Sequence, residues 1–240
     1  MRVILTAAGA MRRWTVDGEL YGGVPKHLIP IDGEPLIHRT VRILRDRGVT
    51  DIWVVAPPDP RYVTDGAQTH VPDHHVPWAG GSTRHDCDKF LSSRELWDQH
   101  GRTVIVHGDV YLAEDAADRI IGHQAESWCL FARYRRFNRP FHKLETVAFS
   151  FHPEDHKPMD VVLRRLVGLQ DDGTIPRTGT WELYRGLRGD PVAELGRIKR
   201  INHHVVTPGH SVEIEPPTTD LDRPAEYEGL MRYLGLQVAA

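Results

Sequence analysis

The sequence has little cysteine, little net charge and no long apolar run. Its two cysteines, Cys87 and Cys129, form no CxxC pair, which argues against a disulfide framework or a cysteine-based zinc site. No window approaches the ~20 apolar residues of a membrane span, and no charged leader precedes an apolar stretch at the N-terminus. The 30 basic and 33 acidic side chains leave a formal charge of −3, so no global field attracts nucleic acid or anionic lipid. We therefore expect a cytoplasmic protein with no membrane partner, and nucleic acid is not favoured as a partner.

Histidine, in contrast, is abundant, with 15 residues. His70, His74 and His75 have a helix-like spacing, as do His152 and His156, and such spacing can present metal ligands on one face. Both groups lie among proline and aspartate residues that are typical of loops, and no carboxylate pattern completes a site. We favour the interpretation that these histidines face solvent.

Apolar strand patterns alternate with helical patterns along the 240 residues. The predicted strands are 2–6, 51–55, 103–107, 128–132, 146–151 and 212–214, and the predicted helices are 35–47, 83–96, 113–124 and 224–234. Gly48 follows the first helix, where a left-handed cap is favoured. This order predicts an α/β fold of three layers with a mostly parallel central sheet. No repeat, low-complexity tract or linker divides the chain, so we expect one domain over residues 1–240.

Polar residues cluster after three of these strands, at the edge of the sheet where open α/β proteins bind ligands. They are Ala7, Ala8, Gly9, Arg13 and Lys26 after the first strand, Asp109 after 103–107, and Asp220 and Asp222 after 212–214. Small residues let backbone amides approach phosphates, Arg and Lys add positive charge, and two separated aspartates can hold Mg²⁺. Each cluster on its own is weak evidence for a ligand site, since a single aspartate such as Asp109 is also a common helix cap.

Taken together, three motifs carry a resemblance to a known family. The stretch LTAAGAMRRW…PKHLIPIDGEPLIHRTV, residues 5–41, is similar to L-A-A-G-x-G-x-R, P-K-x-L and G-x-P-L-I of the nucleotidyltransferases with a glycosyltransferase-A-like, Rossmann-like fold. AGGSTRHDC, residues 79–87, resembles the G-G-x-x-R-x-x-S segment of the methylerythritol-phosphate and ribitol-phosphate cytidylyltransferases. DLDRPAEYEGL, residues 220–230, resembles the D-x-D-T-P-E-D ending of the wider group. Met11 stands where the family has a second glycine, and Cys87 where it has serine.

The resemblance implies a role for each matching residue. Arg13 and Lys26 fall on the two cations at the reacting phosphates, and Asp109 and Asp222 on the ligands of Mg²⁺. The residues on nucleotide-binding positions are Ala7, Ala8, Gly9, Gly80, Gly81, Arg84 and Cys87. The implied reaction is a Mg²⁺-dependent transfer of a nucleotidyl group from a nucleoside triphosphate, CTP or UTP being favoured, to a sugar- or polyol-phosphate, with release of pyrophosphate.

The segment of residues 133–211 matches no family motif, and within it residues 168–190 are irregular and rich in glycine and charge. We interpret 133–211 as an acceptor-side region. It opens with RYRRFNRPFHK, in which Arg135 and Arg136 are candidates to bind the phosphate of a small acceptor. The same mixture of arginine and aromatic residues is typical of single-stranded nucleic-acid binding, and also of a solvated strand edge guarded by positive charge.

Two other functions stay open at this stage. One is a glycosyltransferase of the same fold that uses a nucleotide-sugar donor, including on a polymeric acceptor, because Asp220-Leu221-Asp222 is formally a D-x-D motif. The other is a binding or regulatory module in which Met11 marks a loop that has lost catalysis. The sequence leaves the acceptor and the formation of a homodimer open.

Overall fold

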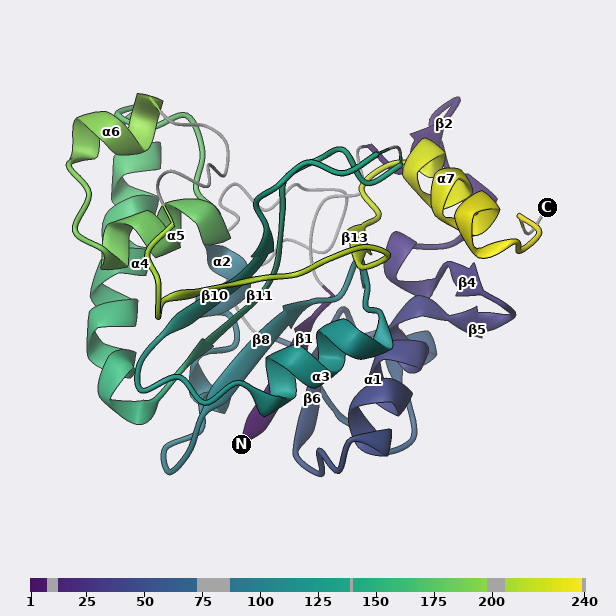
Figure 1. Ribbon diagram of the computed structural model, residues 1–240, viewed down its shortest axis with the longest axis horizontal. Helices are drawn as coiled ribbons and strands as arrows, with labels where there is room; N and C mark the ends of the chain where they lie inside the picture. Colours follow the sequence, from purple (N-terminus) through teal and green to yellow (C-terminus); the bar gives the residue numbers. More distant parts are fainter. Residues whose placement is uncertain (8–12, 73–86, 139, 198–205, 239–240) are drawn as a thin grey trace.

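The computed structural model describes residues 1–7, 13–72, 87–138, 140–197 and 206–238 (Figure 1). At its centre is a seven-stranded sheet with the order β12-β10-β11-β8-β1-β6-β7. Its strands are β1 (Arg2–Thr6), β6 (Ile52–Val55), β7 (Gln68–His70), β8 (Thr103–His107), β10 (Cys129–Arg133), β11 (Glu145–Phe151) and β12 (Ser211–Glu213). Only β11 runs antiparallel to its neighbours, β8 and β10. The mostly parallel sheet predicted from the sequence is confirmed.

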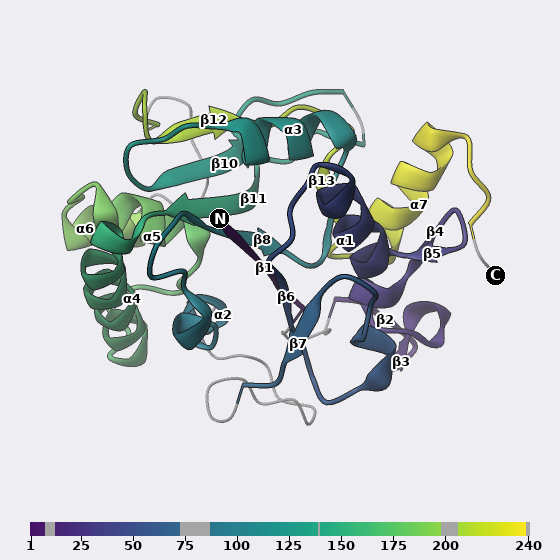
Figure 2. The same ribbon diagram turned by 90° about the horizontal axis from the view of Figure 1, so that it is seen from below.

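Helices cover both faces of this sheet (Figure 2). On one face lie α1 (Leu36–Asp46) and α3 (Glu114–Gly122), and on the other α2 (Asp88–Leu91), α4 (His156–Asp171) and α5 (Thr180–Leu187). Successive side chains of a strand point to opposite faces. Leu5 therefore packs in the apolar cluster that includes α1 and α3, and Ile4 in the cluster that includes α4 and α5. This double burial is what makes the strands read as continuous apolar runs.

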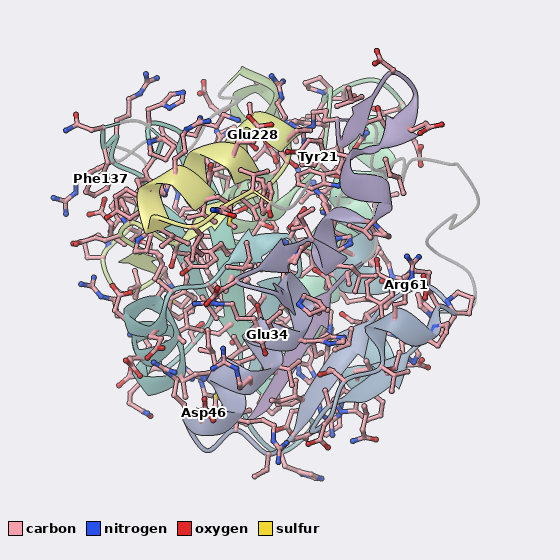
Figure 3. The ribbon with its side chains drawn as sticks, turned by 90° about the vertical axis from the view of Figure 1, so that its right-hand side faces the viewer. Tyr21, Glu34, Asp46, Arg61, Phe137 and Glu228 are labelled. Carbon is pink, nitrogen blue, oxygen red and sulfur yellow. The ribbon has the colours of Figure 1, made fainter. Side chains whose placement is uncertain are left out.

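A third apolar cluster lies beside α7 (Pro224–Leu234), next to two small hairpins. The hairpins are β2–β3 (Thr15–Val16 with Glu19–Leu20) and β4–β5 (Pro30–Ile31 with Glu34–Pro35). Trp14 is fully buried there, edge-on to Tyr21 and Tyr227 at ring-centroid distances of 5.5 and 6.3 Å. The Tyr21 hydroxyl donates a hydrogen bond of 3.1 Å to Glu228 of α7, and Figure 3 shows the two residues on adjoining elements. The chain that follows the first strand is therefore anchored to the last helix.

The remaining described elements are short. They are α6 (Val192–Arg197), the two-residue strands β9 (Val110–Tyr111) and β13 (Thr219–Asp220), and 3-10 turns at Tyr21–Gly23, Lys26–Leu28, Pro60–Tyr62, Arg94–Leu96 and Pro153–Asp155. No helix within the described ranges is long and apolar enough to cross a membrane.

Two predictions of local structure were wrong. In the described part of 83–96 the chain forms only the single turn of α2 and a 3-10 turn, not one continuous helix. The stretch 168–190 is not irregular throughout, because it holds the end of α4 and all of α5. Burial of Trp181, Leu183 and Tyr184 against the sheet stabilises α5 despite the surrounding glycine and charge, since tertiary packing supplies most helix stability in proteins.

The sheet core gives a direct test of this packing. Ile105 lies in β8 and is 1% exposed, so Ile105→Ala removes buried apolar surface and leaves a cavity. We expect a loss of about 2–5 kcal/mol in the free energy of unfolding, measured by urea denaturation. The matched control is Val161→Ala on α4, where the side chain is 57% exposed and the expected change is below about 0.5 kcal/mol. Equal losses in the two variants would contradict the described core.

Candidate active site

Three aspartates meet beyond the carboxyl end of β8. Asp109 lies in the turn between β8 and β9, while Asp220 ends β13 and Asp222 follows it. Strand β13 pairs with β9, and the Leu221 amide donates a 2.9 Å hydrogen bond to the Asp109 carbonyl oxygen. These backbone bonds join segments that are distant in the sequence. As a result, one carboxylate oxygen from each aspartate lies within 4.8 Å of the others.

The turn that carries Asp109 approaches β1 closely. The Gly108 amide donates a 3.0 Å hydrogen bond to the Thr6 carbonyl oxygen, and a Cβ on Gly108 would lie only 2.8 Å from that oxygen. Only glycine fits such a contact without a backbone shift. The glycine before Asp109 therefore brings this carboxylate to the end of β1.

Two cations converge on the aspartates. Lys26, on the 3-10 turn after the β2–β3 hairpin, is 6% exposed; its Nζ pairs with Asp109 and lies 3.2 Å from Asp222 Oδ1. Arg13 Nη2 lies 2.6 Å from Asp222 Oδ2, and its side chain is 59% exposed. The structure thus brings together four residues selected from the sequence, two cations and two aspartates.

In this cluster the negative charge of the carboxylates exceeds the positive charge of Lys26 and Arg13. Burial alone would lower the pKa of Lys26, but the surrounding aspartates outweigh it and raise this pKa above its ordinary value. Burial opposes the charge on Asp109, yet the Lys26 ammonium holds the pKa of Asp109 well below its usual range. At Asp220, burial acts first, and the charges of Asp109 and Asp222 add to it, so the pKa of Asp220 rises well above its usual range. One lysine and one exposed arginine therefore do not fully compensate three carboxylates.

The donor set fits a hard divalent cation. Mg²⁺ takes oxygen ligands, and carboxylates are its usual protein ligands. Asp220 Oδ1 is shielded from solvent and has no hydrogen-bond partner within the described part of the chain, as expected of an oxygen that awaits a cation. Sequence reasoning proposed Asp109 and Asp222 as the pair of ligands and missed Asp220. The signal was present, because residues at i and i+2 of an extended segment share a face.

His27 follows Lys26 in the sequence, and its ring is uncharged. It is 1% exposed, and its Nδ1 lies 3.3 Å from the Tyr62 hydroxyl. Burial lowers the pKa of His27 to about 3, so the ring is neutral at physiological pH. A neutral ring at this position does not compete with Lys26 for the aspartates.

The expected nucleotide-binding residues are placed unevenly. Ala7 is buried, and its amide donates a 2.8 Å hydrogen bond to the Val55 carbonyl oxygen, so it extends the sheet. Cys87 is fully buried in the apolar cluster that contains Phe90, which holds its thiol in the core and not at a solvent-facing pocket. We therefore leave these two out of the proposed nucleotide contacts. Outside the described residues lie Ala8, Gly9, Met11, Gly80, Gly81 and Arg84.

The arginines of RYRRFNRPFHK have different surroundings. Arg135 is exposed and pairs with Glu213 of β12, and Arg136 is exposed as well. Arg133, which was not singled out, is fully buried and pairs with Glu145. The segment is therefore not one uniform basic surface.

The described histidines of the two groups selected from the sequence are half-buried and contact their neighbours, so the expectation that they face solvent was wrong. His152 Nε2 lies 2.9 Å from the Ala125 carbonyl oxygen, and the His156 ring lies 5.3 Å from the Trp97 ring. His70 pairs with Glu95, while His74 and His75 lie outside the described residues. Within the described ranges, the aspartate cluster is the one group of three metal-binding side chains.

A family model matches this chain. The MobA-like NTP transferase domain aligns with residues 3–150, which include β1, Lys26 and Asp109. This match covers more than half of the chain, so the chain belongs to the MobA-like NTP transferase family. The protein is a nucleotidyltransferase by class.

Individual relatives agree with this family. The chain is 39% identical over 92 residues to 2-C-methyl-D-erythritol 4-phosphate cytidylyltransferase of Saccharopolyspora erythraea, a match that spans 37% of this chain and 40% of that relative. CTP:phosphocholine cytidylyltransferase from Streptococcus pneumoniae has a similar structure, with a TM-score of 0.54, 12% identity and coverage of 97% and 98% of the two chains. UDP-glucose pyrophosphorylase from Acinetobacter baumanii has a TM-score of 0.55 at 10% identity, covering 97% and 92%. These structures confirm the predicted nucleotidyltransferase fold.

Because negative charge is in excess in the aspartate cluster, removing the charge of one carboxylate is expected to stabilise the folded protein. Asp220 has a folded-state pKa above its unfolded-state value, so its favourable contribution exists below the unfolded-state pKa and is lost as the pH rises through the folded-state pKa. We expect Asp220→Asn to raise the free energy of unfolding by about 0.5–2 kcal/mol at about pH 8 without divalent cations. The gain should shrink as the pH falls through the folded-state pKa and vanish below about pH 3, where the carboxyl is protonated in both states.

Urea denaturation in the presence of a chelator measures this effect. Asp222→Asn is the matched control, because its carboxylate is paired with Lys26 and Arg13 and its removal should give no gain. An Asp220→Asn variant less stable than the parent at alkaline pH would contradict the assigned imbalance.

Proposed function

We propose that the protein catalyses the Mg²⁺-dependent transfer of a nucleotidyl group from a nucleoside triphosphate, with CTP or UTP preferred, to a sugar- or polyol-phosphate, releasing pyrophosphate. The observation that carries this proposal is the convergence of Lys26 and Arg13 on three aspartates at the carboxyl edge of the sheet. Membership in an NTP transferase family supports it. The names of two similar proteins, which specify a phosphorylated acceptor and cytidylyl transfer, support the choice of base and acceptor.

The chemistry requires positioning and charge neutralisation more than a protein nucleophile. An oxygen of the acceptor phosphate attacks the α-phosphorus, and the bond from that phosphorus to the bridging oxygen breaks, so that pyrophosphate leaves in line. Both reactants are anionic, and holding them in line removes much of the barrier. Mg²⁺ bound by Asp109, Asp220 and Asp222 would supply Lewis-acid polarisation of the phosphate under attack.

Lys26 and Arg13 are the residues that we assign to the growing charge. Preorganised cations stabilise negative charge that develops on the α-phosphate and on the leaving pyrophosphate. Lys26 can exchange its carboxylate partners for phosphate oxygens once the negative charge of the cluster is neutralised. Arg13, which is more exposed, can do so without leaving a buried position.

The proposed substrate contacts follow the family motifs. By their place in these motifs, we propose Gly80, Gly81 and Arg84 as contacts of the pyrimidine base, and Ala8 and Gly9 as contacts of the phosphates. On the acceptor side, Arg136 is the stronger candidate, since Arg135 already pairs with Glu213. We also propose a cytoplasmic location, in line with the expectation from the sequence.

Pyrophosphate release tests the proposed reaction. We expect release with CTP or UTP ahead of ATP and GTP, when Mg²⁺ and a panel of sugar- and polyol-phosphates are present. Asp109→Asn should lower the rate at least about 100-fold, because cation-assisted charge stabilisation is worth several kcal/mol. The matched control is Asp115→Asn, an exposed aspartate in the first turn of α3, which should retain the parent rate.

The other functions would give different results in this assay. Triphosphate binding without pyrophosphate release would favour a binding or regulatory module. Cleavage of a nucleotide sugar without pyrophosphate release would favour a glycosyltransferase. Parent-like activity of Asp109→Asn with Mg²⁺ as the sole metal would remove Asp109 from the site.

The two cations are expected to act on the transition state. Lys26→Met keeps the length of the side chain and removes its charge, and Arg13→Ala removes the guanidinium. We expect each to lower kcat by about 100-fold, with a smaller change in KM for the triphosphate, in steady-state kinetics. Lys157→Met, at an exposed position of α4, is the control that should change neither.

A different pattern of kinetic constants would revise these roles. A raised KM for the triphosphate with an unchanged kcat would mean that the cations anchor the ground state. Unchanged kinetics in both variants would contradict their place at the reacting phosphates.

A further inference from the structure

The strand that carries Asp220 is not part of the central sheet. β13 pairs with β9 over only two residue pairs, and Figure 1 places it between the central sheet and α7. Two-stranded pairings this short are at best marginally stable on their own. In addition, like charges on Asp109, Asp220 and Asp222 repel one another and disfavour their close approach. Other contacts must therefore hold β13 in place.

A buried ion pair at the end of the β10–β11 hairpin supplies these contacts. Arg133 is the last residue of β10 and faces Glu145, the first residue of β11, across the antiparallel ladder. Arg133 is fully buried, and its Nη2 lies 2.5 Å from Glu145 Oε2. The Arg133 Nε donates a 2.9 Å hydrogen bond to the Lys143 carbonyl oxygen. The guanidinium is thereby fixed from the side of the central sheet.

The same two side chains bind three consecutive residues at β13, Thr218, Thr219 and Asp220. Arg133 Nη1 donates a 2.7 Å hydrogen bond to the Thr218 carbonyl oxygen, and Nη2 donates to Thr219 Oγ1 at 3.2 Å. Glu145 Oε2 accepts hydrogen bonds of 3.0 Å from the Thr219 hydroxyl and from the Asp220 amide. Thus each contact with β13 is made immediately before or at Asp220.

Stability alone does not account for a buried pair of this kind. Replacing a buried ion pair by apolar residues is often neutral or stabilising, because desolvation offsets much of the Coulomb attraction. What this pair adds is geometric specificity, since hydrogen bonds to the planar guanidinium and the carboxylate favour one arrangement of the backbone at Thr218, Thr219 and Asp220.

We infer that Arg133 and Glu145 are positioning residues that hold β13 so that Asp220 and Asp222 face Asp109 as ligands for a divalent cation. The inference rests on the proposed function and deepens it. It also gives the first arginine of RYRRFNRPFHK a role inside the protein, distinct from the acceptor role proposed for Arg135 and Arg136.

Binding of Mn²⁺ alone, followed by electron paramagnetic resonance, tests this inference without turnover. Glu145→Gln keeps the shape of the side chain and an acceptor for the Asp220 amide, but removes the charge that fixes Arg133. We expect its Kd for Mn²⁺ to rise about 10–100-fold, as is typical when a residue that orients metal ligands is changed. Asp190→Asn is the matched control, because Asp190 pairs at 2.8 Å with Arg185, another fully buried arginine, at the end of α5. It should retain the parent Kd.

A milder variant keeps the test decisive if Glu145→Gln does not fold. Thr219→Val leaves the Arg133–Glu145 pair intact and removes only the hydroxyl that joins the pair to β13. We expect a rise of several-fold in the Mn²⁺ Kd and faster amide hydrogen exchange at residues 218–222, with no change of exchange in α4. A parent-like Kd in a folded Glu145→Gln or Thr219→Val variant would overturn the inference.

Kinetics separate this inference from the proposed function. A positioning role predicts a lower kcat for Glu145→Gln with a nearly unchanged KM for the acceptor, whereas a purely structural role would lower only thermal stability. If the parent binds Mn²⁺ but releases no pyrophosphate with any triphosphate, the proposed function fails and the positioning role remains. If the parent is active and Glu145→Gln has the parent kcat and Kd, the positioning role fails alone. A parent that binds no Mn²⁺ would overturn both.

Discussion

The ion pair between the buried Lys26 ammonium and the Asp109 carboxylate is the interaction on which the rest of the site depends. Three carboxylates with oxygens within 4.8 Å of one another would repel strongly in a partly buried site, where the effective dielectric is low. Lys26 is the buried cation that allows Asp109 to remain charged there. Removing Lys26 would leave the buried Asp109 carboxylate uncompensated, which is far more costly than the net value of the pair.

The fold explains how a lysine comes to lie at this position. Parallel strands β1 and β8 end at the same edge of the sheet, and the Gly108 contact with Thr6 draws the Asp109 turn over the end of β1. The segment from Trp14 to Lys26 is then held from the other side by the aromatic cluster on α7. The site therefore lies between the central sheet and the C-terminal helix α7, with the short strand β13 between them.

This arrangement of charged groups lowers the stability of the fold and leaves oxygen atoms free to bind a ligand. The cluster carries more negative than positive charge among its buried groups, and Asp220 Oδ1 lacks a hydrogen-bond partner in the described structure. Strained or unpaired polar groups of this kind gather at functional sites, where a ligand supplies the missing interaction. The Arg133–Glu145 pair keeps the costly arrangement in place by bonding to the backbone directly before Asp220.

The sequence alone determined the elements whose signals are local. The strand Arg2–Thr6, the strand Thr103–His107 and the helix Pro224–Leu234 lie where their apolar periodicity and cap residues place them, because such patterns depend only on neighbouring residues. The choice of Arg13, Lys26, Asp109 and Asp222 was possible because they lie in short motifs. Only the tertiary structure decided that Asp220 joins them, that Cys87 belongs to the core, that α5 is a helix, and that Arg133 is buried while Arg135 and Arg136 are exposed. These outcomes depend on which distant segments pair and on what each side chain is buried against, and neither is encoded in the spacing of adjacent residues.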